Sequence, residues 1–125
     1  MPGRRPLWVS IGYAVRGLAV ALYRERSVRL HAVAACGAVA LAAWCGLEAR
    51  DWLFVLLAIA LVLAAEMVNT AIEKTLDLHG TGWSPLAGMA KDVAAGAVLV
   101  CALYALAVAY LVLWPAFLAK IGVRP

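Results

Sequence analysis

Four polar residues recur along one apolar stretch of the chain, at Glu66, Asn69, Glu73 and Asp77. On a helix that turns about 100° per residue, this spacing places them in one stripe about 80° wide. An acid inside an apolar segment costs free energy and is therefore a candidate for function by default. The alternative is that Glu66 is protonated in a helix–helix contact or extends toward the membrane interface. Three carboxylates and an amide on one stripe favour a site.

Three further charged residues, Glu25, Lys91 and Asp92, flank the apolar segments on the side where this stripe ends. Mg²⁺ prefers one or two carboxylates plus substrate phosphates, and it keeps several waters. Glu25, Glu73 and Lys91 are therefore candidates to bind Mg–ATP. The chain has neither a G-x-x-x-x-G-K-[ST] sequence nor the protein-kinase signatures, so a nucleotide would bind through metal-bridged carboxylates rather than a phosphate-binding loop.

The composition indicates that membrane helices position these residues. Of 125 residues, 66% are hydrophobic and 14% charged, whereas soluble domains have roughly 45–50% and 25%. Three apolar stretches, at about 30–47, 52–72 (extending to 78) and 91–117, are long enough to cross a hydrocarbon core about 30 Å thick. Spans in lipid are helices or closed barrels, and the period-2 alternation of a barrel is missing. We predict a single all-α domain over residues 1–125 with three transmembrane helices.

Residues 7–29 have a different pattern, in which apolar positions alternate with arginines. Leu7, Ile11, Leu18 and Leu22 fall at helical spacing, which predicts an amphipathic helix lying on the cytoplasmic membrane surface. The net charge of +4 then reflects membrane orientation and anionic headgroups, not nucleic acid.

The basic residues predict the orientation of the spans. Eight of the eleven lie before the first span or around the loop after the second, namely Arg4, Arg5, Arg16, Arg24, Arg26, Arg29, Lys74 and Lys91. By the positive-inside rule, the N-terminus and the candidate site face the cytoplasm. Trp44, Trp52 and Trp114 then fall near the outer helix ends, as in an aromatic belt.

Three parts of the chain resemble a known family. Residues 65–77, AEMVNTAIEKTLD, resemble the E-x-x-N-[ST]-A-I-E-x-x-x-D signature of the prokaryotic diacylglycerol kinases, and residues 90–98, AKDVAAGAV, resemble a second block of that family. Gly12-Tyr13, Arg16-Gly17 and Glu25-Arg26 resemble a third. The resemblance covers about residues 12–114, nearly the whole chain.

The resemblance implies a homotrimeric kinase, integral to the inner membrane of a bacterium, that transfers the γ-phosphoryl group of ATP to a lipid hydroxyl. It implies that Glu66 is the general base, that Glu25 and Glu73 hold Mg²⁺ with ATP, and that Asn69 supports the reacting centre. It further implies nucleotide contacts for Tyr13, Lys91 and Asp92. Asp77, on the stripe, is a further candidate for binding substrate or ATP. Because Glu25 is separated from Glu66 by a whole span, we expect Glu25 of one chain to serve Glu66 and Glu73 of its neighbour.

The substrate is predicted from residues 25–31, ERSVRLH, and from the pair Asn69-Thr70. These resemble the Gram-positive branch, which phosphorylates undecaprenol, whereas the diacylglycerol branch usually has an acid at the position of His31 and Ser at that of Thr70. His31 is alternatively an interfacial hydrogen-bonding residue. Pro85 and Met89 differ from the polar residues of the diacylglycerol branch, so no ATP contacts are assigned in the 79–90 loop.

Two other classes of function are compatible with one membrane-embedded acid. A small multidrug or proton-coupled transporter would need helices packed around charge at the middle of the bilayer, whereas the acids here lie toward one face. A non-catalytic membrane scaffold would leave the polar stripe without a purpose. Undecaprenol kinase is therefore the main hypothesis, and diacylglycerol kinase is the alternative within the same class.

Overall fold

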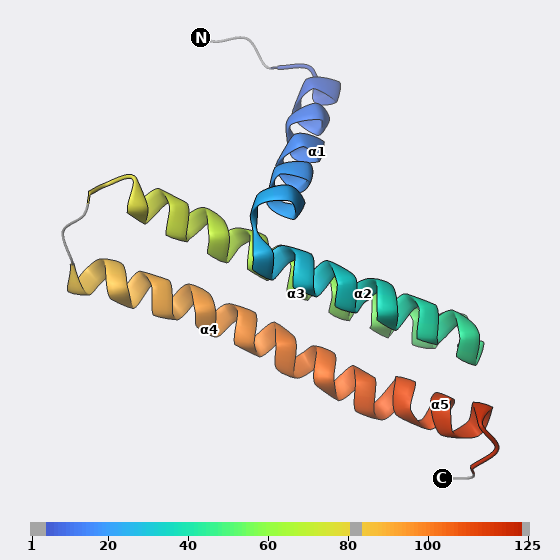
Figure 1. The fold of residues 1–125 in the computed structure, drawn as a ribbon. Coiled ribbons are helices and arrows are strands. Elements are labelled where there is room, and N and C mark those ends of the chain that lie inside the picture. Colours follow the sequence, from blue (N-terminus) through green and yellow to red (C-terminus); the bar gives the residue numbers. More distant parts are fainter. Residues whose placement is uncertain (1–4, 81–83, 124–125) are drawn as a thin grey trace.

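The computed structural model describes residues 5–80 and 84–123, and every regular secondary-structure element in these parts is a helix. In chain order these are α1 (Leu7–Arg24), α2 (Arg26–Cys45), α3 (Ala49–Asp77), α4 (Pro85–Val108), the π-helical turn η1 (Ala109–Leu113) and α5 (Trp114–Lys120). Figure 1 shows α2, α3 and α4 side by side in a bundle from which α1 projects away. The prediction of an all-α protein is confirmed.

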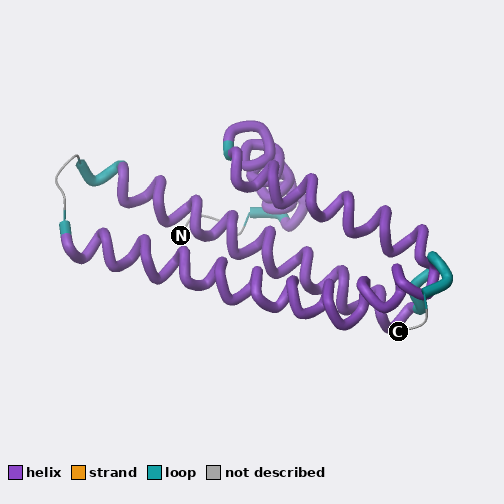
Figure 2. The backbone as a smooth tube through the Cα atoms, turned by 60° about the horizontal axis from the view of Figure 1, so that its bottom comes forward, coloured by secondary structure: helices purple, strands orange, loops and turns teal. Residues whose placement is uncertain are grey.

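Three stretches are long and apolar enough to cross a membrane: Arg26–Cys45, Ala49–Asp77 and the run Pro85–Lys120. Their 20, 29 and 36 residues correspond to about 30, 43 and 54 Å of helix at about 1.5 Å per residue. The second and third stretches are thus longer than a hydrocarbon core. Figure 2 shows that the α3–α4 hairpin extends past the beginning of α2 at the end where residues 81–83 connect it.

The first two helices meet at Glu25, whose backbone is extended with φ −102° and ψ 118°. This break falls earlier than the boundary at 29–30 that the apolar pattern indicates. Arg29 accounts for the difference, because its Nη1 donates to the carbonyl oxygens of Tyr23 at 2.6 Å and Leu22 at 3.5 Å. These carbonyls belong to the last turn of α1, where partners within the helix are lacking. Arg29 therefore caps α1 from within α2.

The turn between α2 and α3 is closed by Gly46, which has a left-handed φ of +71°. Its N–H donates to Ala43 at 3.2 Å, and the N–H of Leu47 donates to Ala42 at 3.3 Å. This pattern is the Schellman motif, in which glycine is favoured because it lacks a Cβ. The short turn makes α2 and α3 antiparallel neighbours.

A cluster of buried side chains lies at the same end as this turn. Val55 and Ala58 of α3 are buried against Val108 of α4, and small side chains there let the helices approach closely. Aromatic rings extend the contact, with Phe117 stacked on Trp114 at 5.9 Å and tilted against Trp44 at 6.2 Å between centroids. Two of the three tryptophans expected at the outer helix ends thus gather in one cluster.

Pro115 accounts for the change of helix type between α4 and α5. Proline has no N–H to donate to the carbonyl four residues earlier, and its ring crowds that carbonyl. The preceding turn, Ala109–Leu113, adopts the wider π-helical form, which absorbs such a disruption without ending the helix. The run from Pro85 to Lys120 therefore remains one continuous helical segment.

Candidate active site

The polar stripe lies on one uninterrupted helix, α3, so its four residues share a face as predicted. Glu66 is the one buried charged residue of the described chain, with 7% of its surface exposed. Its Oε1 lies 3.3 Å from Nε2 of His31 on α2. A buried carboxylate needs a partner to offset its lost hydration. His31 supplies this partner from the neighbouring helix.

One turn further along α3, Asn69 is paired with Glu73. The Asn69 amide donates to Oε1 of Glu73 at 3.3 Å, the i, i+4 relationship that brings two side chains together on a helix. The carbonyl Oδ1 of Asn69 is buried without a partner in the described chain. An unpaired buried acceptor costs free energy, so this oxygen is available to a ligand with a proton or a positive charge.

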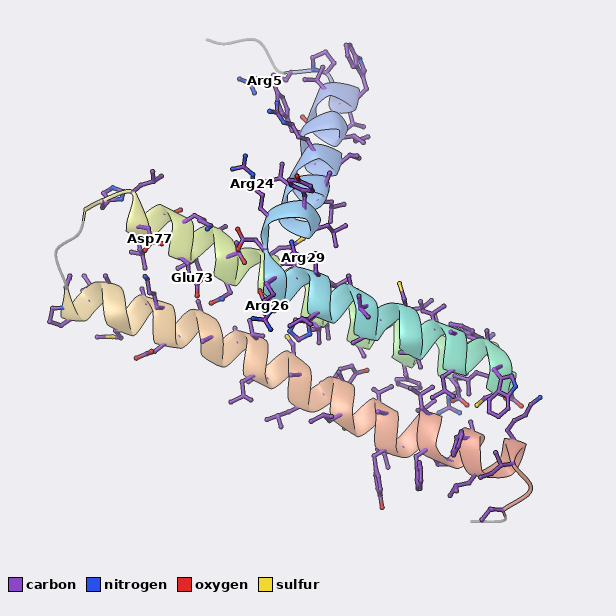
Figure 3. All side chains as sticks on the ribbon, in the orientation of Figure 1. Arg5, Arg24, Arg26, Arg29, Glu73 and Asp77 are labelled. Carbon is purple, nitrogen blue, oxygen red and sulfur yellow. The ribbon has the colours of Figure 1, made fainter. Side chains whose placement is uncertain are left out.

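The stripe ends at Asp77, which pairs with a cation from α4. Nζ of Lys91 lies 2.9 Å from Oδ1 of Asp77, and Figure 3 shows Glu73 and Asp77 pointing from α3 toward α4. Both members of this pair are partly exposed, so the contact contributes little to stability. Breaking the pair therefore costs little free energy, and Lys91 can bind a ligand in place of Asp77.

Glu25 is paired with Lys74 of α3, with Nζ 3.3 Å from Oε1. The sequence pattern did not predict this contact, since the spacing of residues within one helix carries no information about a partner on another. The contact brings the hinge between α1 and α2 against the last turns of α3. Glu25 and the stripe are thus linked through Lys74.

Two predicted site residues lie apart from these contacts. Asp92 is exposed on α4, about 100° around the helix from Lys91. Tyr13 is exposed on α1, with the Arg5 guanidinium 5.7 Å from its ring centroid. Because α1 projects away from the bundle (Figure 1), Tyr13 lies away from the stripe within a single chain.

Positive charge surrounds the acidic stripe. Arg24, Arg26 and Arg29 gather where α1 meets α2 (Figure 3), while Lys74 and Lys91 contact acids directly. The arrangement joins a desolvated carboxylate, an unpaired amide oxygen and several cations at one end of the bundle. Such a set can accept a proton and neutralise a polyanion, as phosphoryl transfer requires.

Comparison with known proteins decides between enzyme, transporter and scaffold. The family model described as prokaryotic diacylglycerol kinase matches residues 12–113 of the chain. The chain belongs to this family. It is 37% identical over 106 residues to an undecaprenol kinase of Bacillus subtilis, covering 85% of this chain and 86% of that protein. The predicted family is confirmed, and of the three classes it supports the enzyme.

Two diacylglycerol kinases are comparably similar. That of Escherichia coli K12 is 33% identical over 106 residues, which cover 85% of this chain and 87% of that protein. That of Synechocystis is 37% identical over 113 residues, which cover 90% of this chain and 65% of that protein. The chain is accordingly a lipid kinase, which uses ATP to phosphorylate a lipid, and its three apolar helices make it a multi-pass membrane protein.

Lys74 is the residue of this site that sequence reasoning missed. In the sequence it counts only as one of the basic residues that predict orientation, although in the structure it pairs with Glu25, one of the predicted metal ligands. The signal that could have found it is its place directly after Glu73, on the side of α3 next to the stripe. Nothing in the local sequence connects it to Glu25, which lies 49 residues earlier (74 − 25).

Proposed function

We propose that this kinase phosphorylates undecaprenol in preference to diacylglycerol. The observation that carries the proposal is the contact between His31 and Glu66, since His31 is the position at which the chain resembles the undecaprenol-phosphorylating branch. The Bacillus subtilis relative named undecaprenol kinase supports it. Diacylglycerol is the alternative acceptor, supported by the relatives named for that activity.

In this proposal Glu66 is the catalytic base. Its carboxylate takes the proton of the lipid hydroxyl as the hydroxyl oxygen forms a bond to the γ-phosphorus, and the bond from that phosphorus to the β-phosphate oxygen breaks to release ADP. The burial of Glu66 beside His31 supports this role, because a base enclosed by neighbouring helices can be held in one position relative to its substrate. Asn69 supports the reacting centre one turn away.

The nucleotide side of the site consists of Glu25, Glu73 and the groups around them. Carboxylate and amide oxygens are the ligands that Mg²⁺ prefers, and the unpaired buried Oδ1 of Asn69 beside Glu73 fits such an ion. No three His, Cys, Asp or Glu side chains of the described chain gather as a complete metal site. In this proposal Glu25 and Glu73 would hold the ion together with nucleotide phosphates. Bound there, Mg²⁺ would neutralise charge on the phosphates.

The remaining predicted residues are assigned to ATP. Lys91 can exchange Asp77 for a phosphate because their pair is partly exposed. Asp77 and Asp92 would then contact the nucleotide, and Tyr13 would line the ATP site. The arginines at the junction of α1 and α2 add a positive field that attracts the polyanion.

We infer that α1 lies on the cytoplasmic surface of the inner membrane. Its side chains are exposed along almost its whole length, large apolar ones among them, and such a helix is stabilised by the interface. Eight of the eleven basic residues fall on the same side as this helix and the site, as the positive-inside rule requires of a cytoplasmic face.

We infer further that the working unit is a homotrimer with sites between subunits. Only eight described residues are buried within one chain, and α1 with Tyr13 projects away from the stripe that it should serve (Figure 1). Co-assembly of Glu25→Gln chains with Glu66→Gln chains tests this, because a shared site would recover some activity in mixed trimers. Each variant alone should stay inactive. Mixed trimers without activity would mean that each site lies within one chain.

The substrate is tested by offering undecaprenol and diacylglycerol together in mixed micelles with labelled ATP. We expect label predominantly in undecaprenyl phosphate, and none in either lipid with the Glu66→Gln variant. Predominant label in phosphatidic acid would make the alternative acceptor correct. Both lipids should be dispersed in the same detergent at equal mole fraction, so that partitioning does not imitate specificity.

A further inference from the structure

His31 contacts the buried acid of the stripe from a different helix. Its Nε2 lies 3.3 Å from Oε1 of Glu66, with 33% of the His31 side chain exposed but only 9% of that of Glu66. The family match and the named relatives assign no role to this histidine. Its place beside the proposed base therefore requires an explanation of its own.

The same imidazole borders an apolar cavity. This cavity, of about 360 Å³, lies among α2, α3, α4 and η1, and His31 is the one ionisable residue that lines it. The other lining residues are apolar, alanines and valines among them. His31 thus contacts the carboxylate and also borders an apolar space between the helices.

A base on a flexible side chain needs to be held. Glutamate has several rotatable bonds, and a catalytic group must be kept within a fraction of an ångström of its productive position. The neighbouring polar groups of the stripe have other partners, since Asn69 bonds Glu73 and Lys91 pairs with Asp77. His31 is the group placed to fix the Glu66 carboxylate.

We propose that His31 is a positioning residue for the base. With lipid bound, the ring turns its Nε2–H onto Oε1 of Glu66, which lies 3.3 Å from Nε2, and so leaves Oε2 directed at the lipid hydroxyl. His31 itself takes no proton from the substrate. This inference rests on the proposed role of Glu66 as the base.

The test compares three substitutions in the full-length enzyme. His31→Leu keeps an apolar side chain beside the cavity but removes the donor, and we expect kcat to fall about 10- to 100-fold, the loss of a hydrogen bond to a charged group. The KM for ATP should be unchanged, because the nucleotide groups lie elsewhere. His31→Gln places an amide N–H near the position of Nε2 and should return kcat to within about 3-fold of wild type. His79→Ala is the matched control, since the His79 ring is bonded to the Thr75 carbonyl near the end of its own helix and not to the stripe.

A second measurement separates positioning from a purely structural role. In a Glu66→Asp background the shorter side chain draws the carboxylate away from the ring, so His31→Leu should cost less than about 3-fold there. Such non-additivity is expected of two residues that act as a unit. Thermal unfolding and oligomeric state should be unchanged in His31→Leu.

Each contrary result overturns one statement. Wild-type kcat in His31→Leu, or a rise only in the KM for lipid, would show that His31 does not position the base. Loss of activity that Gln fails to recover and that accompanies a lower unfolding temperature would assign His31 to the fold alone. Near-normal activity in Glu66→Gln would instead overturn the base assignment in the proposed function.

Discussion

The two ends of the α3–α4 hairpin use the same pair of helices for opposite purposes. At the end near Gly46, Val55 and Ala58 pack on Val108, and aromatic rings close the bundle. At the other end, α3 and α4 extend past α2 and present Glu73, Asp77 and Lys91 in partly exposed pairs. One end provides stability through packing. The other keeps polar groups weakly paired, which leaves them available to ligands.

Glu66 lies near the boundary between these regions and should show the largest effect of any single change. Glu66→Gln keeps size and hydrogen bonding but cannot accept the proton, so we expect kcat to fall about 10²- to 10⁴-fold, the usual contribution of a general base. Binding of ATP should survive, as measured by calorimetry. Glu48→Gln, an exposed acid at the opposite end, is the control and should remain active. A near-normal rate in Glu66→Gln would remove Glu66 as the base.

The metal ligands should give the next largest effect. Glu25→Gln or Glu73→Gln removes an anionic oxygen from the proposed Mg²⁺ site, and we expect the KM for Mg–ATP to rise about 10-fold or more. High magnesium should restore part of the loss, because the weakened site can still be filled by mass action. Asp51→Asn, in the first turn of α3 at the packed end, serves as the matched acid. Unchanged ATP affinity in both variants would contradict the metal assignment.

Substituting one lysine at each end of the bundle compares the two ends directly. Lys91→Met should raise the KM for ATP about 3- to 10-fold, since one charge-assisted contact with phosphate is lost. Lys120→Met removes a cation 5.7 Å from the Trp44 ring at the packed end, and it should leave the KM for ATP unchanged. If both substitutions raised the KM for ATP equally, ATP binding would not be confined to the end of the hairpin that carries Lys91.

A substitution in the packed core should have the smallest effect on activity. Val55→Ala removes methyl groups from a residue that is 2% exposed, and we expect a loss of about 1 kcal/mol of stability. Helix association in lipid has no hydrophobic driving force, so the cost is lost packing. Thermal unfolding in detergent measures the shift, and activity per folded molecule should be unchanged. A large fall in kcat without loss of stability would show that the core shapes the site directly.

Much of the architecture could be predicted from local pattern. Helical periodicity relates each residue only to those within a few turns, so the stripe from Glu66 to Asp77 follows from spacing alone. The three apolar helices follow from the length of the hydrocarbon core. Helix ends are less predictable, because the break at Glu25 depends on Arg29 folding back onto carbonyls of the preceding helix.

The sequence by itself determined the helices, the stripe and, through its motifs, the family. Only the tertiary structure decided which partner each polar group has: His31 for Glu66, Lys74 for Glu25, and Lys91 for Asp77. These partners lie 14 to 49 residues apart along the chain (91 − 77 and 74 − 25). Contacts at such separations depend on how helices pack and where they turn, and no local spacing encodes them.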